Sequence, residues 1–514
     1  MREFSHPLSE FTKGLRPDVN MPRNSGYATE LYNSRCGVAG LEVPPLIVYP
    51  ISGTPTVNWP LPQLVKINDL LLTSTGLYFI AYTAGNFVVS SVGTDYSLTQ
   101  VYSGAGKAAY NTPYVWNPAG SGVQAIPPRF TIADFGYFQI WCHPALMLKR
   151  AMDGDDNYVW SQILIGLNGS GISPSVRCVC NFRGQLIAGM WTYYADTTGS
   201  TTDNLVAWSE IGSVNPTTMF NRTYSYIDRR TDDGGLVVQP YKRTSGNYRT
   251  GSTSTVYRVL PLGNGVMVYC SDKIFYMKAV SIPEPTFGIV PVADFGIPST
   301  FCAEGDEHEH LIVDSSKDLW RVKEGPKLER LGYKEFIGVM SGTIVISKNP
   351  NYGDYYISNG STTYLLSPFG LSKWFQYPTS LVWEDSNKRL IGPIAVASDV
   401  SASMASDVHD FGVRSIKTIT GMETGGSGQV LTGNVDYKYK VTDATFTSSR
   451  FKTANNLGVI TPLVSGVDFK FRVKGADYTK FDLDYLTIRY KYVDKRMLRG
   501  VYATNDKVLS RTSR

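Results

Sequence analysis

The sequence predicts an all-β fold, and three observations lead to this prediction. Gly 48, Pro 28 and Tyr 33 among 514 residues indicate many turns and many aromatic strands. Helical periodicity is almost absent along the chain. What recurs is a short β-prone run that ends at a Gly or Asp turn and is followed by a strand of aromatic or aliphatic residues, which is the pattern of a β-hairpin.

The hairpin turns are spaced like the blades of a β-propeller. They fall at Gly76, Gly136, Gly184, Asp272, Asp318 and Asp354. Most intervals lie near the roughly 40–50 residues of one four-stranded blade, so six or seven blades are expected between about residues 60 and 385. The interval from 184 to 272 is longer and contains either one blade with a long loop or a further blade. A series of β-sandwiches would give similar turn spacing and stays open as an alternative.

Three segments are expected along the chain. Residues 1–55, rich in Pro and Asn, form an extended N-terminal arm that joins the platform. Residues 56–390 form the β-propeller, and residues 391–514 form a C-terminal β-sandwich, the platform, with a basic tail. The one β-prone run of the arm, LIVYPI at 46–51, is expected to pair with an open edge of the sandwich.

The sandwich is predicted from strands that alternate apolar and polar residues. VDFKFRVKG (467–475) and FDLDYLTIRYKYVDKR (481–496) both show this period of two, so each is expected to be half-buried. The inner side of the second is expected to consist of Phe481, Leu483, Tyr485, Ile488 and Tyr490.

The bulk composition restricts the class of protein. Charged residues make up 18% of the chain, below the roughly 25% usual for soluble globular proteins, which suggests a surface covered by partner subunits. A net charge of +5 does not by itself indicate nucleic-acid binding. Six scattered cysteines do not form a disulfide framework, and neither a secretory signal nor a membrane-spanning segment is evident. We therefore expect maturation in a reducing, soluble compartment, the cytoplasm.

Three short motifs resemble ligand sites, and each departs from the pattern that the chemistry needs. In SGAGKAAY no Ser or Thr follows the Lys of the phosphate-loop pattern. In DGDDNY (153–158), Tyr158 occupies the position of the Gly in a calcium loop. In EGDEHEHLIVD, His308 and His310 would share one strand face, but no third ligand accompanies them, so an exposed acidic hairpin is favoured over a metal site. Cys178 and Cys180 are expected to be buried hydrophobic residues. No catalytic residue, metal or cofactor is predicted.

The basic C-terminal end suggests contact with phosphates. Arg496, Arg499 and Arg511 lie in YKYVDKRMLRGVYATNDKVLSRTSR. They are candidates for a channel surface that contacts DNA phosphates without base specificity, and a solvated tail is the alternative.

One long segment resembles a known family. FRGQLIAGMW, followed after a loop by DNLVAWSEIGSVNPTTM, is similar to a recurring segment of short-tailed bacteriophage (podovirus) tail hub or nozzle proteins. The matching positions are Leu186, Ala188, Gly189, Trp208, Ser209, Gly212 and Pro216. The N-terminal arm also resembles theirs, at Gly14, Pro17, Asn33, Gly40 and Pro44. No separate inserted domain is evident, so the resemblance is to the compact hub.

The resemblance implies a structural virion protein and not an enzyme. It implies a propeller and a platform that assemble as a homohexameric ring below the portal and its adaptor, in the virion tail. Such a ring extends the channel through which genomic DNA is ejected and anchors tail fibres or spikes. Trp208, Ser209 and Trp320 would then close blades, with the Trp208 ring over the preceding strand and Ser209 accepting a turn N–H. The alternative is a propeller that binds or hydrolyses glycans, with Trp141, Trp191 or Trp208 stacked on sugars.

Overall fold

The fold is known from a computed structural model. It describes residues 3–8, 13–18, 24–25, 27–38, 40–44, 47–48, 68–83, 86–93, 98–105, 130–143, 146–153, 157–163, 176–191, 202–209, 246–251, 254–280, 287–378, 383–384, 390–391, 394–396, 401–426 and 430–493. Apart from the short helical turns η3 (Thr300–Cys302), α3 (Lys334–Ile337) and η4 (Tyr478–Lys480), the regular structure in these ranges is β-strand. The predicted all-β class is thus confirmed. Within the same ranges, no helix is long and apolar enough to cross a membrane.

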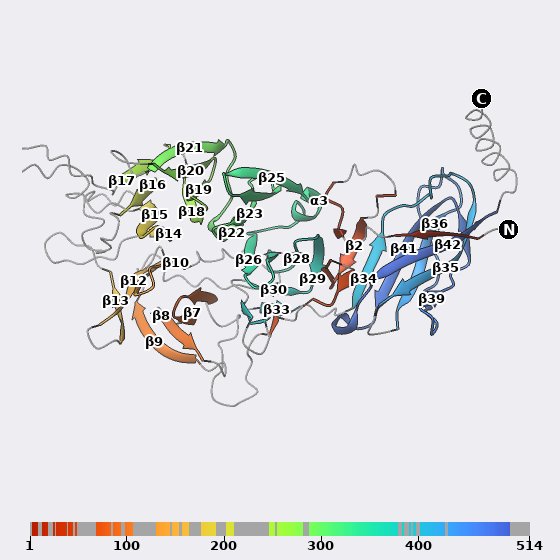
Figure 1. The fold of residues 1–514 in the computed structure, drawn as a ribbon, viewed down its shortest axis with the longest axis horizontal. Coiled ribbons are helices and arrows are strands. Elements are labelled where there is room, and N and C mark those ends of the chain that lie inside the picture. The colour runs from red at the N-terminus through yellow and green to blue at the C-terminus, as the bar shows by residue number, and fades with distance from the viewer. Residues whose placement is uncertain are drawn as a thin grey trace, which may run out of the picture.

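Six four-stranded antiparallel units follow one another along the chain, and each is a propeller blade. Figure 1 shows them arranged around a common centre in the left-hand part of the molecule. The first three consist of β6 (Asn68–Thr73), β7 (Gly76–Thr83), β8 (Asn86–Val92) and β9 (Leu98–Ala105); β10 (Thr131–Asp134), β11 (Phe138–His143), β12 (Leu146–Met152) and β13 (Tyr158–Gln162); and β14 (Val176–Phe182), β15 (Gln185–Trp191), β16 (Thr202–Trp208) and β17 (Gly246–Arg249).

The next three blades are built in the same order. They consist of β18 (Val256–Leu262), β19 (Gly265–Cys270), β20 (Ile274–Ala279) and β21 (Phe287–Ala293); β22 (Ala303–Gly305), β23 (Glu309–Val313), β24 (Leu319–Lys323) and β25 (Lys327–Gly332); and β26 (Val345–Asn349), β27 (Asp354–Ser358), β28 (Thr363–Leu366) and β29 (Leu371–Trp374). The fold is therefore a β-propeller, as predicted.

The structure of the third blade explains the long interval between the turns at 184 and 272. β16 pairs with β17, with Leu205 opposite Arg249, although residues 210–245 separate the two strands in sequence. The interval is one blade with a long insertion, and the insertion itself lies outside the described residues. The first hairpin of this blade turns at Arg183 and Gly184, whose φ angles are +52° and +78°. Two residues with positive φ match the right-handed twist of the flanking strands, which is why a Gly marks this turn.

In blades two to six, the first strand lies nearest the centre. β10 contacts β14, β14 contacts β18, β18 contacts β22, and β22 contacts β26. In the described ranges, the fourth strands of blades two to six make no comparable contacts with one another. The blades pack face to face, and their apolar faces form shared clusters; one of these joins Val206 and Trp208 of blade three to Phe275 and Phe287 of blade four. Because blades diverge away from the centre, their outer strands are less covered than their inner ones.

Short strands follow blade six where a seventh blade would begin. β30 (Gln376–Pro378) pairs with β33 (Ile394–Val396), and β30 contacts β27 of blade six. β31 (Trp383–Glu384) pairs with β32 (Leu390–Ile391), which pairs in parallel with β5 (Ile47–Val48). The LIVYPI run was expected to pair with the sandwich, and this expectation is wrong. Ile47 and Val48 instead pair with a strand that follows the propeller in sequence.

The platform is a β-sandwich that includes both ends of the described chain. One sheet has the order β1 (Phe4–Pro7), β42 (Tyr485–Tyr492), β35 (Lys417–Gly425) and β39 (Val459–Ile460), with β40 (Val464–Gly466) also on β35. The facing sheet contains β2 (Ala28–Tyr32), β34 (Ala402–Ser406), β41 (Asp468–Gly475), β36 (Thr432–Lys438), β37 (Thr447–Ser448) and β38 (Lys452–Thr453). The small hairpin of β3 (Arg35–Cys36) and β4 (Leu41–Glu42) belongs to the arm. Two strands of the arm thus complete the sandwich, one in each sheet.

Blade six and the platform share a single sheet. β2 pairs in parallel with β29, with Tyr32 opposite Lys373, and on its other edge β2 pairs with β34. The result is a ten-stranded sheet that runs from β26 of the propeller to the far edge of the platform (Figure 1). The N–H of Asn33 donates to the carbonyl of Lys373 at 2.8 Å, and that of Leu15 donates to the carbonyl of Leu371 at 2.8 Å. The arm therefore joins the two parts by backbone hydrogen bonds.

The inner face of the last strand differs from the expected one at a single position. Phe481, Leu483 and Ile488 are fully buried and Tyr490 is nearly so, as predicted, but Tyr485 is 52% exposed. The regular alternation begins only at Leu486, which is buried, because β42 starts at Tyr485 and the chain before it is not extended strand.

Candidate functional site

Trp208 and Ser209 end the third strand of blade three. The N–H of Leu186 donates to Ser209 Oγ at 2.9 Å, and the N–H of Ser209 donates to the Leu186 carbonyl at 3.0 Å. The Trp208 ring meets the Phe287 ring edge to face at 5.4 Å and lies against Gly246. Ser209 thus accepts an N–H from the neighbouring strand β15, and Trp208 packs toward blade four. Both residues are buried: Ser209 ties two strands of blade three together, and Trp208 packs blade three against blade four.

Trp320 closes a turn of blade five. Its Nε1–H donates to Asp314 Oδ2 at 2.9 Å, while Asp314 Oδ1 accepts the N–H groups of Ser316 and Asp318, both at 2.8 Å. The Trp320 ring stacks on Phe295 at 4.8 Å. The carboxylate of Asp314 therefore organises the β23–β24 turn and fixes the indole, which is a structural arrangement.

His308 and His310 do not share a face. His308 lies in the turn before β23, its side chain is 72% exposed, and its Nδ1 lies 3.1 Å from Glu324 Oε1. His310 is fully buried, with Nδ1 2.7 Å from the Tyr269 hydroxyl and Nε2 2.9 Å from the Pro261 carbonyl. A carbonyl only accepts, so Nε2 carries the proton and Tyr269 donates to Nδ1. Burial lowers the pKa of His310 to about 4. Among the described residues, no group of three or more His, Cys, Asp or Glu side chains could hold a metal ion.

The remaining motif residues are buried in the core, stabilise turns, or lie outside the described ranges. Cys178 and Cys180 are buried, and burial raises the pKa of the Cys178 thiol to about 11, which suppresses the reactive thiolate. Asp153 Oδ1 accepts the N–H of Asn157 at 2.9 Å and so forms a hairpin turn. The Lys of SGAGKAAY and the channel candidates Arg496, Arg499 and Arg511 lie outside the described residues.

Two of the three tryptophans considered for sugar stacking are not accessible. Trp141 is fully buried and Trp208 is 5% exposed, so neither presents a ring face to a ligand. Trp191 is the last residue of β15, and its side chain is not among those described.

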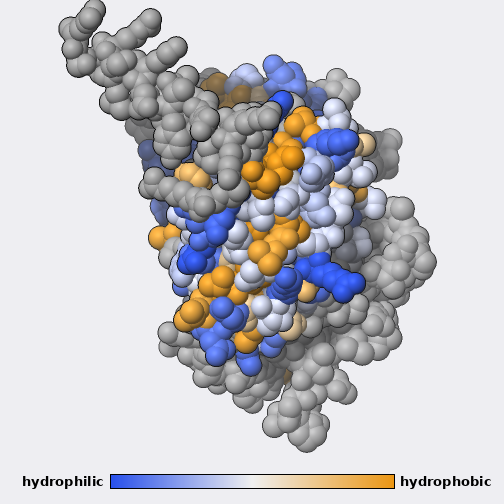
Figure 2. All heavy atoms as spheres, turned by 90° about the vertical axis from the view of Figure 1, so that its right-hand side faces the viewer, coloured by the Kyte–Doolittle hydropathy of each residue, from blue (hydrophilic) through white to orange (hydrophobic). Residues whose placement is uncertain are grey.

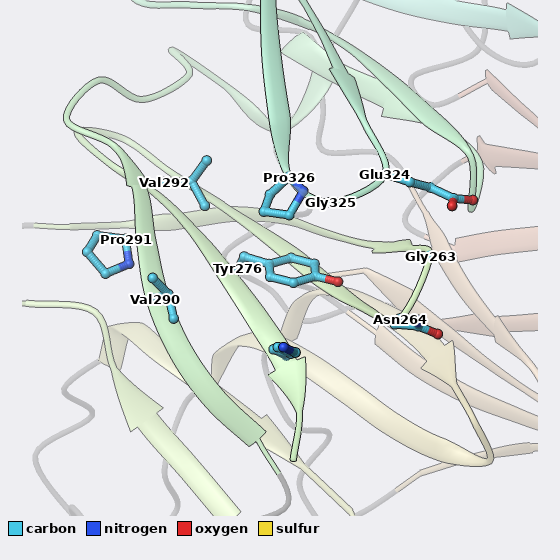
Figure 3. Close-up of a pocket in the computed structure, with 10 residues that line it drawn as sticks. Gly263, Asn264, Tyr276, Val290, Pro291, Val292, Glu324, Gly325 and Pro326 are labelled. Carbon is cyan, nitrogen blue, oxygen red and sulfur yellow. The ribbon is translucent and has the colours of Figure 1, made fainter.

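A pocket of about 610 Å³ opens between the outer parts of blades four and five. Figure 3 shows the Tyr276 ring in its middle, with Val290, Pro291 and Val292 of β21 on one side and the turn Glu324–Pro326 on the other. Tyr276 and Lys278 come from one face of β20, and Gly263 and Asn264 come from the β18–β19 turn. No sequence pattern predicts this site, because it depends on how far the β24–β25 turn reaches over the neighbouring blade.

The polar groups of this pocket are partly engaged by neighbours. The Tyr276 hydroxyl donates to the Leu262 carbonyl at 3.4 Å, and Asn264 Oδ1 accepts from Arg183 Nη2 at 2.7 Å. The described lining is mainly apolar and contains no Ser, Cys, His or Asp. The pocket therefore offers apolar contacts with a charged rim, and its described residues form no nucleophile–base pair.

Exposed apolar side chains are numerous on the platform. Among the described residues, twenty large apolar side chains are exposed, and eight of them lie between 430 and 493. These are Val430, Tyr439, Val441, Phe451, Leu457, Leu463, Tyr485 and Val493. Figure 2, which looks onto the platform, shows a band of apolar surface between hydrophilic areas. Such bands are typical of surfaces that contact a partner.

Comparisons with known proteins give no family. No family model matches the chain, and no curated protein is similar to it. Among solved structures, a protein from Lactobacillus plantarum aligns with a TM-score of 0.35 and 10% identity, over 63% of this chain and 89% of that one. A quinonprotein alcohol dehydrogenase-like protein from Bacteroides thetaiotaomicron aligns with a TM-score of 0.31 and 10% identity, over 60% of this chain and 65% of that one. At these TM-scores neither likeness bears on function.

Proposed function

We propose that the protein is a structural ring subunit, the tail hub or nozzle of a short-tailed phage. In this proposal, about six copies close a ring through their platforms. The ring extends the DNA ejection channel below the portal and its adaptor and anchors tail fibres or spikes. The sequence resemblance supports the proposal that the ring belongs to a phage tail. One structural observation, the exposed apolar end of the platform, supports the proposal that the chain forms a ring.

This platform end is defined by Val430, Leu457 and Tyr485. Their side chains are 65%, 84% and 52% exposed. Backbone hydrogen bonds bring their strands together: Thr424 N–H donates to the Gly458 carbonyl at 3.0 Å, and Asp484 N–H donates to the Gly425 carbonyl at 2.8 Å. In the same region Ala454 N–H donates to the Leu431 carbonyl at 2.9 Å.

Apolar side chains held rigidly in water gain free energy when a partner covers them, by about 25 cal/mol per Å² of buried apolar surface. Since the platform end is built on paired strands, a partner does not have to order it. A second copy of the same chain, rotated about a ring axis, would cover it with a different part of its own surface, and such contacts close into rings. The platform is therefore the part of the chain expected to make the ring contacts.

The test is the assembly state of the full chain and of two matched variants. Leu457→Asp places a charge on the platform end, and Val290→Asp places one on an exposed position, 53% accessible, at the rim of the inter-blade pocket. We expect closed rings of the unaltered protein and of Val290→Asp in negative-stain images and by mass photometry, and a shift of Leu457→Asp to single subunits. Single subunits alone for the unaltered protein at high concentration, together with tails that lack such a ring, would contradict the proposal.

A further inference from the structure

Two histidines face each other where the N-terminal strand covers the platform. His6 of β1 and His409, which precedes β35, have ring centroids 6.3 Å apart. The His6 and Phe411 rings are perpendicular, with centroids 5.2 Å apart. His6 extends inward from one sheet and His409 from the other, because the backbone of His409 is paired with that of Phe469 in β41. We call His6 and His409 the histidine pair.

His409 is held as a neutral ring without polar partners. Its side chain is 1% exposed, and neither Nδ1 nor Nε2 has a hydrogen-bond partner in the structure. The fixed contacts of the residue are backbone ones: its N–H donates to the Phe469 carbonyl at 2.8 Å, and it accepts from Phe469 at 3.0 Å. A protonated imidazole here would have two N–H donors and no acceptor, which is unfavourable in a buried site.

The charged groups around the pair do not supply that acceptor. Asp407 accepts from the Ser25 hydroxyl at 3.1 Å and from the N–H of Val408 at 2.7 Å. Asp410 accepts from Asn24 Nδ2 and from the N–H of Gly412, both at 2.9 Å. These two carboxylates attract a charged His409 without bonding to its ring.

Further charges lie on the other elements that pack here. At the start of β35, the buried Lys417 donates to the carbonyls of Val413 and Ser415, and Asp468 of β41 is the carboxylate that favours its charged form together with Asp410. On the outer side of β1, Glu3 lies 3.8 Å from Lys491 of β42. Lys417 repels the protonated imidazoles of the histidine pair. The strand β1 separates these imidazoles from Glu3 and Lys491.

The N-terminal strand β1 is a short strand at the edge of its sheet. Four residue pairs join β1 to β42, from Phe4 opposite Tyr490 to Pro7 opposite Thr487, and the N–H of Leu8 donates to the Leu486 carbonyl at 2.8 Å. Beneath it, Phe411 has a φ angle of +52°, a conformation that is strained for a bulky residue. Edge elements with few buried contacts open at a lower free energy than the core.

We propose that β1 is an acid-released strand: protonation of the histidine pair undocks it from β42 and exposes the edge of the platform sheet. This inference stands independently of the proposed function.

The direction of the effect follows from the pKa values. Burial, and then the neighbouring His6, lower the pKa of His409 to about 4 from 6.5, and burial also lowers the pKa of His6. The neutral ring is favoured in the docked state, so docking is fully supported above pH 6.5 and loses this support as the pH falls toward 4. If His409 regains its ordinary pKa of 6.5 when β1 leaves, linkage makes undocking roughly 25-fold more favourable at about pH 5 than at about pH 7.5.

The test is hydrogen exchange of the full chain, read as protection factors so that the pH dependence of the intrinsic rate is removed. We expect the protection of residues 4–8 to fall by roughly 25-fold or more between about pH 7.5 and about pH 5, while β36 and β41 keep theirs. His409→Phe, which retains an aromatic ring and cannot be protonated, is expected to remove most of this fall. His6→Phe, at a half-buried position, serves where His409→Phe does not fold, and is expected to reduce the fall.

The control variant is His308→Phe, which alters an exposed histidine of blade five and is expected to leave the fall unchanged. Protection of residues 4–8 that is equal at the two pH values would overturn the proposal. So would a full loss of protection at low pH in both His409→Phe and His6→Phe.

Discussion

At the scale of single residues, Arg35 links the arm to the propeller. Its Nε and Nη2 donate to the two oxygens of Asp354 at 2.9 and 3.0 Å, and its Nη1 donates to Glu42 at 2.9 Å. Asp354 is fully buried, and burial raises its pKa despite this partner. Asp354 therefore depends on Arg35 to remain charged in the interior.

Arg35→Met leaves the buried carboxylate unpaired. We expect the free energy of unfolding to fall by about 3–5 kcal/mol, since removal of one partner of a buried ion pair is strongly destabilising. Urea unfolding measures this change. The matched control is Arg16→Met, because the ion pair of Arg16 with Glu335 is 3.4 Å long and partly exposed, and pairs of that kind contribute about 0–1 kcal/mol. Equal effects of the two substitutions would argue against the role of Arg35.

The buried network of Tyr269, His310 and Pro261 joins blades four and five and should make the propeller sensitive to acid. The folded pKa of His310 is about 4, below its ordinary value of 6.5, so its contribution to stability is complete above pH 6.5 and is lost as the pH falls toward 4. We expect a loss of about 2–3 kcal/mol between about pH 7 and about pH 4.5 from this group.

Denaturant unfolding at the two pH values checks this expectation. The double variant Tyr269→Phe/His310→Leu replaces both side-chain partners by apolar groups and should lose less stability on acidification. His308→Leu is the control, since His308 is exposed and Glu324 raises its pKa. If the double variant kept the full acid sensitivity, another group would be responsible.

At the scale of elements, the junction between β2 and β29 depends on glycine. Gly14 has a φ angle of +77°, and a Cβ added there would lie 2.6 Å from the Leu371 carbonyl oxygen of β29. Gly342 has a similar φ of +75°, but nothing lies within 4 Å of its added Cβ. The two glycines share the same backbone conformation, but only Gly14 lies close to the backbone of another strand.

Gly14→Ala should therefore weaken the junction more than Gly342→Ala weakens its own turn. Each substitution costs about 1–2 kcal/mol for the left-handed conformation, and Gly14→Ala adds a clash with backbone that cannot move cheaply. Hydrogen exchange of residues 13–16 and 28–33 measures the loosening, which we expect in Gly14→Ala alone. Equal protection in both variants would show that the close approach is tolerated.

The elements also show what the sequence could and could not predict. The turns at Gly76, Gly136 and Gly184 lie in first hairpins of blades, whereas Asp272 and Asp318 lie in second hairpins, so the turn spacing was uneven although the blades are regular. The turn residues identified the hairpins correctly. They did not show whether a hairpin is the first or the second of its blade. In the last strand, alternation predicted four of the five inner residues and failed at Tyr485, where the strand begins.

The candidate sites were harder to predict than the fold. His308 and His310 are two residues apart, yet only His310 lies in the strand, and the turn places His308 in solvent. The inter-blade pocket combines residues of two consecutive blades, and the histidine pair combines residues that are far apart in the chain. No local sequence pattern predicts such contacts. The family resemblance stays a prediction.

At the scale of the whole molecule, the two-part organisation followed from changes in composition, but the connection between the parts did not. Tyr32 pairs with Lys373 across more than half the chain, and nothing in the local sequence of β2 (ATELY) or β29 (LSKW) indicates this partner. Pairings of such long range are set by the complete fold and not by their own sequence.

The ten-stranded sheet also has a mechanical consequence. Peptide groups lie in an unbroken ladder from β26 to β37, so a twisting load on blade six passes directly into the platform. We expect the two parts to turn together, because relative rotation would require the backbone hydrogen bonds that β2 makes with β29 and β34 to break. If copies are fixed to one another through their platforms, any tilt of one propeller is transmitted to its neighbours.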